Sequence, residues 1–425
     1  MNSTNQKNYT LPIIMMVALF FMISFVTGLQ NPFGVIVKHQ FQATNLMSQL
    51  GNAANFIAYA FMGVPAGMLL QKIGYKKTAL LAIIVGFVGV FISYLSGLAG
   101  SYAVYLTGAF VSGFSMCMLN TVVNPMLNTL GGGGNKGNQL IQVAGSVNSI
   151  GATIVPVLVG YLMGDAAQAT ISDAAPALFL AMGIFALAFI VLISMSIPEP
   201  SLERQQKSSS SSDKHSAFSF RHFILGTVAI FIYVGVEVGI PNFMNLFATS
   251  EELGIDPTTA GSLVGTYWFL MMVGRLCGAS LGARFSSKSM LTLASAVGLV
   301  FILIAIFAPI TTKVSMPVFL SSLSFGMVEV PIGIMFLALC GLCTSIMWGG
   351  IFNLAVEGLG KYTEAASGFF MVMVCGGGIL PLIQGVVADN AGFQASYFVI
   401  LVGLAYLLYY ALIGSKNVNK DIPVD

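Results

Sequence analysis

A single acidic residue, Glu237, falls deep inside a long apolar segment, in the stretch IYVGVEVGIPNFMN of residues 232–245. Charge at the depth of a bilayer is unfavourable, so such a residue usually faces a cavity or a partner and marks a pathway. Pro241 cannot donate a hydrogen bond to the Glu237 carbonyl, so the helix can bend or open there. Asn245 shares this helix face. The pattern predicts a binding site for a polar solute; the alternative is a structural carboxylate that binds a neighbouring helix.

Amide and aromatic side chains recur in the other apolar segments. If these side chains faced lipid, their hydrogen-bond donors and acceptors would lack partners. We therefore expect most of the side chains to face the interior of the protein. Amides pair with hydroxyl groups and aromatic rings pack on the apolar side of a sugar ring, so the set suits a polyhydroxy solute. The alternative roles are interhelical hydrogen bonding and, for the tryptophans, packing. The candidates are Gln30, Asn31, Asn120, Asn124, Gln142, Asn148, Asn242, Asn245, Tyr267, Trp268, Trp348, Asn353 and Gln384.

The composition is that of a membrane protein. Of the 425 residues 56% are hydrophobic and 8% charged, and mean hydropathy is +0.89, whereas soluble domains carry about 25% charged residues. The net charge is +2 and basic residues are not interleaved with aromatics, so we expect no nucleic-acid partner. The five cysteines lie in apolar segments and Cys340-x-x-Cys343 lacks a second ligand pair, so we expect packing roles and no metal or cofactor.

Apolar segments long enough to span a bilayer recur along the whole chain, which predicts an all-α membrane protein with twelve transmembrane helices. A polar stretch over 198–222 is expected to be a linker between two six-helix halves, 1–197 and 223–425. The expected helices are 11–37, 46–70, 78–99, 102–130, 140–162, 176–197, 223–247, 258–281, 290–310, 331–356, 363–388 and 393–413.

Loop charge predicts the orientation. With both termini on one side, 14 Lys and Arg residues fall in loops on that side, against two on the other, and Arg275 lies within a helix. Cytoplasmic loops carry the excess of positive charge, so we expect cytoplasmic termini and linker. We expect a monomer in the cytoplasmic (inner) membrane of a bacterium.

The two halves repeat one another. The glycine, leucine and two basic residues of 67–76 recur in 278–288, and the glycines, isoleucine and proline of 151–160 recur in 376–385. Such a parallel repeat is found in transporters whose halves rock about a central site. We expect Lys72, Lys76, Arg275 and Arg284, near the ends of the corresponding helices, to serve the gate.

Residues 67–77, GMLLQKIGYKK, resemble the loop signature of the major facilitator superfamily, with Gln71 in place of the usual acid. Four stretches look like the fucose:proton symporter family, and most of all its glucose/galactose-type members: IYVGVEVGIPNF, VGRLCG (273–278), LNTVVNPMLNTLG (119–131) and residues 358–389. The resemblance implies the major facilitator fold, with a sugar site built from the first, fourth, fifth, seventh and eleventh helices and with proton coupling.

The chain departs from this family at the residues that the resemblance would make functional. Asn120 stands at the position of the fourth-helix acid, the first helix has no acid, and Gly145 stands where a glutamine is usual. Glu237 matches the seventh-helix glutamate and is the buried candidate left to take up a proton, since burial disfavours its charged form.

We therefore expect a secondary transporter that imports a hexose or related sugar by alternating access, with proton symport as the leading form of coupling. The alternatives are sodium-coupled or uncoupled sugar transport, efflux of another small molecule by antiport, and a receptor without transport. A membrane enzyme is not expected, because Glu237 has no acidic partner in the membrane and the three histidines lie in loops.

Overall fold

The computed structural model describes residues 9–42, 45–163, 170–199, 215–282, 284–320 and 324–424, most of them helical. Within these ranges the side chains of a few residues are not described. Gln30 and Asn31 are among these, so these two predicted site residues lie outside the described part of the structure.

The N-terminal half consists of α1 (Thr10–Gln40), α2 (Asn45–Ala99), α3 (Tyr102–Leu130), α4 (Gly134–Met163) and α5 (Ala175–Ser194). The two helices expected over 46–70 and 78–99 both lie in α2, which is broken at Gly74, where φ is 82° and ψ is 178°. Glycine adopts a positive φ without the strain that a side chain would impose. Gly74 therefore makes the turn between two consecutive membrane crossings.

The C-terminal half is described from residue 215 and has more interruptions. Two expected helices are divided, the tenth at residues 345–346 and the eleventh by the 3-10 turn η3 (Met373–Cys375). The half consists of η1 (Ala217–Ser219), α7 (Arg221–Ala248), α8 (Pro257–Leu281), α9 (Ser287–Phe307), α10 (Ile332–Thr344), α11 (Met347–Val356), η2 (Gly360–Tyr362), α12 (Thr363–Val372), α13 (Gly376–Ala391), α14 (Phe393–Tyr409) and η4 (Tyr410–Gly414).

A β-hairpin, which the sequence analysis did not anticipate, fills the long connection after α9. Its strands β1 (Lys313–Phe319) and β2 (Phe325–Pro331) pair antiparallel. The hairpin packs on α8: the Phe319 ring stacks on Phe269 at 5.1 Å and the Phe319 N–H donates to Thr266 Oγ1 at 2.8 Å. These contacts hold the hairpin against the C-terminal half.

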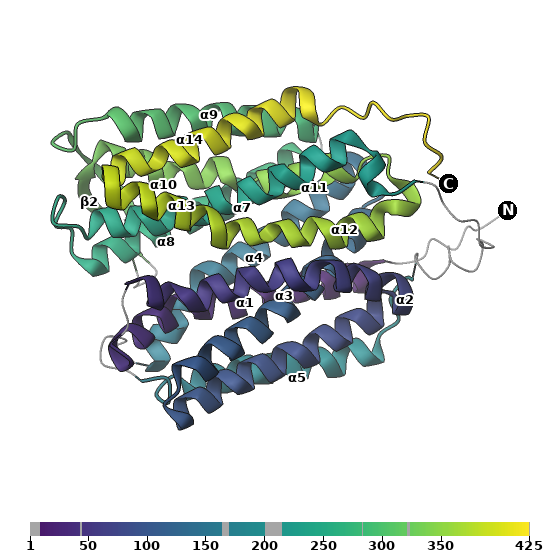
Figure 1. Cartoon of the computed structure of the whole chain (residues 1–425), viewed down its shortest axis with the longest axis horizontal. Helices are drawn as coiled ribbons and strands as arrows, with labels where there is room; N and C mark the ends of the chain where they lie inside the picture. Colours follow the sequence, from purple (N-terminus) through teal and green to yellow (C-terminus); the bar gives the residue numbers. More distant parts are fainter. Residues whose placement is uncertain are drawn as a thin grey trace.

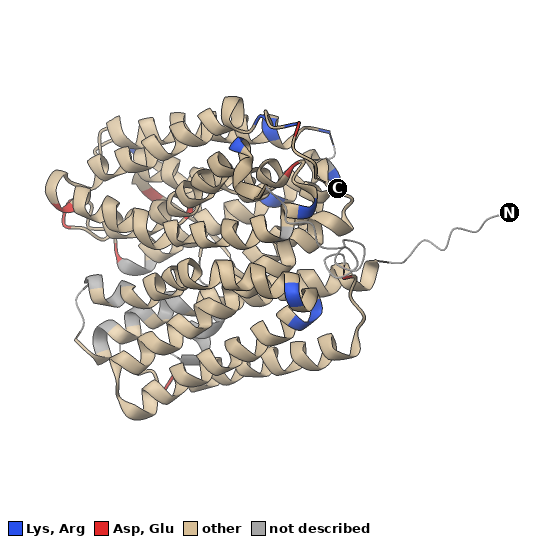
Figure 2. Ribbon diagram, turned by 45° about the vertical axis from the view of Figure 1, so that its right-hand side comes forward, with Lys and Arg blue, Asp and Glu red and all other residues tan. Residues whose placement is uncertain are grey.

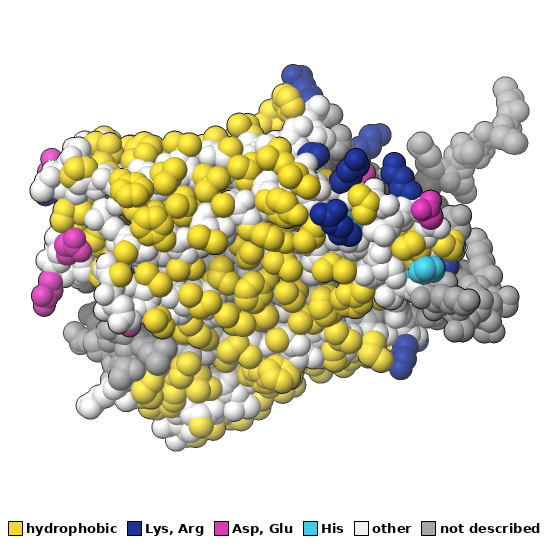
Figure 3. Space-filling model, turned by 45° about the horizontal axis from the view of Figure 1, so that its top comes forward, with side chains coloured by type: hydrophobic (Ala, Val, Ile, Leu, Met, Phe, Trp, Pro, Cys, Tyr) yellow, Lys and Arg dark blue, Asp and Glu magenta, His cyan; other side chains and the backbone are white. Residues whose placement is uncertain are grey.

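Twelve helical crossings are present in the described residues. Nine stretches are long and apolar enough to span a membrane, and one of them, Leu50–Ala99, contains two crossings because it turns back at Gly74. The remaining two crossings are α4 and α8, which carry more polar side chains. Hydrophobic side chains cover the flank of the molecule, and charged ones gather at its ends (Figure 3). The chain is an integral membrane protein.

The helices form two bundles that lie side by side, with α1, α2, α3 and α5 in one and the C-terminal elements in the other (Figure 1). The start of α1 and the segment after η4 lie at one end of the molecule, here called the termini end, and the β-hairpin lies at the opposite end, the hairpin end. Most Lys and Arg residues gather at the termini end (Figure 2). This asymmetry agrees with the charge distribution expected from the sequence.

The surface along which the two bundles meet is called the seam. At the seam α12 approaches α2 without intervening side chains: a Cβ on Gly368 would lie 2.7 Å from Gly67 Cα and 2.8 Å from the Gly63 oxygen. Since such distances are shorter than any real Cβ contact, these glycines are required for backbone-to-backbone packing. The seam is therefore tightly closed between these two helices.

Candidate functional site

Glu237 lies near the middle of α7 and faces two other functional groups. The Tyr233 hydroxyl donates to Glu237 Oε1 at 2.8 Å, and Arg275 Nη2 of α8 lies 3.2 Å from the same oxygen. The Glu237 side chain is 14% exposed and that of Arg275 is 10% exposed. The carboxylate thus has a counter-ion and a hydroxyl partner, and a small part of its surface stays uncovered by the protein in the middle of a transmembrane helix.

The Glu237 carbonyl is not open, contrary to the expectation from Pro241. α7 runs through Pro241 without interruption, and the Tyr267 hydroxyl of α8 donates to the Glu237 carbonyl at 3.1 Å. The same hydroxyl lies 2.9 Å from Thr344 Oγ1 at the end of α10. Tyr267 therefore supplies the hydrogen bond that proline cannot make, and its role in this structure is to join α7, α8 and α10.

Arg275 crosses the seam. Its Nη1 donates to the Gly145 carbonyl at 2.9 Å and to Ser149 Oγ at 2.8 Å, both on α4 of the N-terminal half. Its Nε donates to the Ser345 carbonyl at 3.2 Å, where the tenth crossing is interrupted. One guanidinium group thus binds both halves of the molecule as well as Glu237.

A chain of amide and aromatic groups leads across the seam beside Glu237. Asn120 Nδ2 donates to the Tyr59 hydroxyl at 3.0 Å, and Asn124 Nδ2 lies 3.3 Å from Asn120 Oδ1. Trp348 Nε1 of α11 donates to Asn124 Oδ1 at 3.0 Å, and the Trp348 ring lies 6.2 Å from the ring of Tyr233. These five residues are called the amide–aromatic cluster; through Tyr233 it is continuous with Glu237.

Two more predicted residues bind across the seam nearer the termini end. Asn353 Oδ1 accepts from Asn128 Nδ2 at 3.2 Å, and Gln142 Nε2 donates to the Ile346 carbonyl at 3.0 Å. Asn148 lies at the level of Arg275: its Nδ2 donates to the Phe20 carbonyl of α1 at 2.7 Å. In this structure these three amides join helices, which is the alternative role that the sequence left open for them.

Four other candidates lie apart from the amide–aromatic cluster. Gln384 is fully buried within the C-terminal half, where its Nε2 lies 3.4 Å from Ser396 Oγ. Trp268 packs edge-on against Tyr267. Further along α7, Asn242 is half-buried and Asn245 is exposed.

Of the residues expected to form a gate, Lys76 binds within its own half. Lys76 Nζ donates to the carbonyls of Ile193 at 2.8 Å and Met195 at 2.6 Å, at the end of α5. In return Glu199 accepts from the backbone N–H groups of Tyr75 at 2.6 Å and Lys76 at 2.9 Å, just after the Gly74 break. Lys72 and Arg284 are exposed. Among the four, Arg275 is the residue with described contacts across the seam.

Tyr59, Tyr233, Ser149 and Asn128 were missed by the sequence analysis. Tyr233 stands four residues before Glu237, on the same helix face, and this spacing could have identified it. The others carry no comparable signal, since their partners lie on distant segments.

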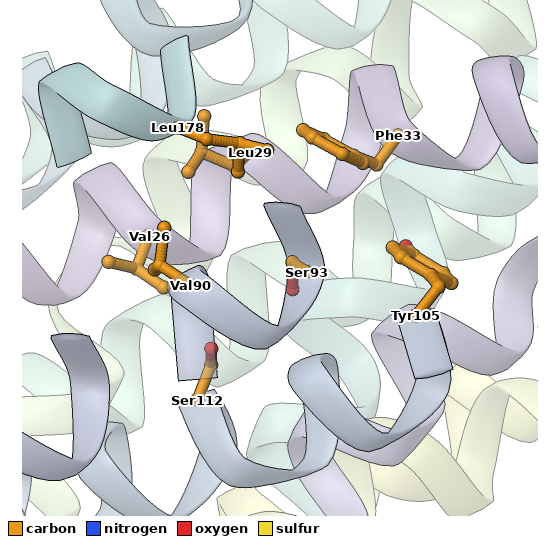
Figure 4. Close-up of a pocket in the computed structure, with 8 residues that line it drawn as sticks. All are labelled: Val26, Leu29, Phe33, Val90, Ser93, Tyr105, Ser112 and Leu178. Atoms are coloured by element: carbon orange, nitrogen blue, oxygen red, sulfur yellow. The ribbon is translucent and has the colours of Figure 1, made fainter. Parts of the chain in front are cut away.

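A small cavity of about 10 Å³, lined by Val26, Phe33, Ser93 and Tyr105 among others, lies within the N-terminal half and away from the seam (Figure 4). It has room for about one water molecule.

Comparison with known proteins establishes the family. The sequence model of the Major Facilitator Superfamily matches residues 16–380. The chain belongs to the Major Facilitator Superfamily. The expected fold class is thereby confirmed, and so is the expectation of a transporter rather than an enzyme.

Relatives within the superfamily cover nearly the whole chain. A glucose/galactose transporter of Brucella abortus biovar 1 (strain 9-941) is 30% identical over 98% of this chain and 97% of its own length. An L-fucose-proton symporter of Escherichia coli (strain K12) is 24% identical over 91% of this chain and 89% of its own. These relatives confirm the resemblance found from the sequence motifs.

Solved structures of the superfamily share the fold. A crystal structure of the transporter FucP in the outward conformation superposes with a TM-score of 0.79 at 21% identity, and it covers 96% of this chain and 100% of that one. The proton:xylose symporter XylE superposes with a TM-score of 0.68 at 11% identity, over 96% of both chains.

Proposed function

We propose that this protein imports a hexose or a closely related sugar by alternating access, coupled to protons. The observation that carries the proposal is the amide–aromatic cluster, which joins Asn120, Asn124 and Trp348 across the seam beside Glu237. Amides donate to and accept from vicinal hydroxyl groups, and the rings of Trp348 and Tyr233 offer apolar faces to a sugar ring. The glucose/galactose transporter and fucose symporter among the relatives support a sugar as the solute.

Glu237 is the proposed proton carrier. It is an acid in the middle of a transmembrane helix, next to the proposed sugar site and not fully covered by neighbouring side chains. A carboxylate that exchanges a proton at this place can link the occupancy of the site to the proton gradient. Because Arg275 is close by, the ionised form is also accommodated.

We propose that the termini end is cytoplasmic and that the protein works as a monomer in the inner membrane of a bacterium. The excess of Lys and Arg at the termini end supports this orientation (Figure 2). The hydrogen bonds across the seam lie between Glu237 and that end, which supports a conformation closed to the cytoplasm. Residues 1–197 and 223–425 are the proposed moving bodies, with 198–222 as the linker.

Uptake into proteoliposomes tests this function. Radiolabelled glucose, galactose and fucose are offered under an imposed pH gradient or an imposed sodium gradient, with the parent protein and Glu237→Gln. We expect accumulation driven by the pH gradient in the parent, and its loss in Glu237→Gln with exchange of internal for external sugar retained. Equal accumulation by the two proteins would remove the coupling role of Glu237.

The main alternative is sugar transport that is driven by sodium or runs without coupling. Carbonyl and amide oxygens near Glu237 offer ligands that sodium accepts. Asp389, the acid described on α13, is exposed near the end of that helix and lies apart from this place. Accumulation under the sodium gradient alone would select the sodium-coupled form. Equilibration without accumulation under either gradient would select the facilitator.

A further inference from the structure

We propose that Arg275 ties the protonation of Glu237 to the closure of the seam at the termini end. In this view Arg275 is a positioning residue: it holds the two halves together while Glu237 is ionised and releases them when Glu237 takes up a proton. The inference rests on the proposed proton-coupled cycle and adds to it the residue through which the proton acts on the conformation.

The geometry divides the contacts of Arg275 between the two halves. On its own half the guanidinium binds Glu237 Oε1 and the Ser345 carbonyl. On the other half it binds the Gly145 carbonyl and Ser149 Oγ of α4. Because Glu237 and Arg275 both belong to the C-terminal half, their ion pair can move as a unit. Of the contacts that Arg275 makes, opening at the termini end breaks only those to α4.

Gly145 makes this crossing possible. A Cβ at residue 145 would lie 3.3 Å from Arg275 Cδ and 3.6 Å from Nε, so even a methyl group would press on the arginine. A longer side chain would occupy the path that the guanidinium takes to the Gly145 carbonyl. Family members usually carry a glutamine at this position. Here glycine leaves the space that the Arg275 side chain occupies.

The charge balance gives the direction of the effect. A buried guanidinium is stable at the seam while the Glu237 carboxylate compensates its charge, and breaking a buried pair by neutralising one member is strongly unfavourable. Arg275 is 10% exposed in the closed arrangement. With Glu237 neutral, the arginine gains from reaching water, which opening at the termini end allows. Protonation thus favours the open arrangement.

No other charged group is described near this pair. The titratable groups that face it are Tyr233 on α7, Tyr267 on α8 and, beyond Tyr267, Cys340 and Cys343 on α10. The α4 side presents Asn148 and Ser149, which do not titrate. Tyrosine and cysteine side chains are ordinarily neutral at pH 7, so Glu237 and Arg275 are the members of this group that carry charge.

Distances between spin labels test the proposal directly. Cysteines replace Lys136 and Lys288 to report on the termini end, and Ser172 and Glu251 to report on the hairpin end; all four are exposed. The exposed native Cys277 is changed to serine in every variant. Distance distributions are recorded in lipid nanodiscs for the parent, Glu237→Gln, Ser149→Ala and the pair combined.

We expect Glu237→Gln, which imitates the protonated acid, to raise the ratio of open to closed arrangements at the termini end about tenfold or more, because a hydrogen-bonded charge is lost. Ser149→Ala should raise the same ratio by a smaller factor. The double variant should raise it by less than the product of the two single-variant factors, because both substitutions act through Arg275. An unchanged distribution in Glu237→Gln, or two factors that multiply, would overturn the proposal.

Asn128→Ala is the matched control, since it removes a neutral hydrogen bond across the same seam. Its effect should multiply with that of Glu237→Gln, because Asn128 does not act through the ion pair. Uptake measured in parallel separates the two proposals. If the distance distribution shifts in Glu237→Gln but the parent takes up no sugar, the role of Arg275 stands and the proposed sugar substrate is wrong. If the parent shows proton-driven uptake but the distribution does not shift, the proposed function stands and the role of Arg275 is wrong.

Discussion

The Tyr267 hydroxyl donates a hydrogen bond to the Glu237 carbonyl, at 3.1 Å, in the place of the backbone N–H that Pro241 lacks. A proline inside a transmembrane helix frees a carbonyl, and neighbouring side chains commonly satisfy it. Here the side chain comes from α8, and the bond holds the acid-bearing turn of α7 against the helix that carries Arg275.

Replacement of Tyr267 by phenylalanine should destabilise the protein by about 1 kcal/mol, since hydrogen bonds between membrane helices are worth roughly 0.6–2 kcal/mol. In a Pro241→Ala background the loss should be smaller, because the alanine N–H can donate to the Glu237 carbonyl. Unfolding in mixed micelles of the four proteins measures this cycle. A full loss in both backgrounds would mean that the Tyr267 hydroxyl serves Thr344 and not the Glu237 carbonyl.

Asn120→Ala should weaken sugar binding about tenfold or more, because the substitution removes a buried amide of the proposed sugar site and the hydrogen bond that it donates to the Tyr59 hydroxyl. Isothermal titration of the purified protein with the sugar identified by uptake gives the dissociation constants. The control is Asn390→Ala, an exposed amide on α13. Equal losses in both variants would point to a general effect on folding.

Gly368→Val should shift the protein toward the arrangement that is open at the termini end, because a side chain here would collide with the backbone of Gly63 and Gly67 in the closed one. The same pair of spin labels at positions 136 and 288 reports the change. Gly261→Val is the matched control on α8, where an added Cβ meets nothing within 4 Å. A closed distribution in Gly368→Val would show that α2 and α12 can separate without opening the seam.

Glu199→Ala should lower the midpoint of thermal unfolding without changing the ratio of open to closed arrangements. Its carboxylate accepts two backbone N–H groups at the start of the helical segment after Gly74, and the loss of such a cap costs about 0.5–2 kcal/mol. These contacts join the start of the expected linker to the N-terminal half, so they do not cross the seam. A changed open-to-closed ratio would instead assign Glu199 to the gate.

The sequence was sufficient for the number of crossings and for placing an acid inside the seventh crossing, because each depends on local hydropathy along one helix. The sequence could not show which residues pair with one another across the seam. Whether Asn353 meets a solute or Asn128 depends on residues far apart in the chain, 225 positions in this case. Charge type alone also did not show that Lys76 binds α5 while Arg275 crosses to α4.

The interruptions were missed for a related reason. The segment over 331–356 is mostly apolar, and Thr344 and Ser345 are too few to interrupt its hydropathy, so hydropathy gave no sign of the break at 345–346. That break matters to the site because its backbone carbonyls are hydrogen-bond acceptors. The Ser345 carbonyl accepts from Arg275, and the Ile346 carbonyl accepts from Gln142. The hairpin over 313–331 was anticipated only as a long connection, because its alternation of buried and exposed residues is short and both faces carry apolar side chains.

Besides those of Arg275, the described side-chain hydrogen bonds across the seam join neutral groups: Asn128 with Asn353, Gln142 with the Ile346 carbonyl and Trp348 with Asn124. Dissolved ions screen interactions between exposed charges over about 10 Å at 0.1 M, but they act little on amide hydrogen bonds or on a buried ion pair. These contacts should therefore keep their strength in dilute and in saline surroundings. Any dependence of the conformational equilibrium on ionic strength should come from the exposed Lys and Arg residues at the termini end.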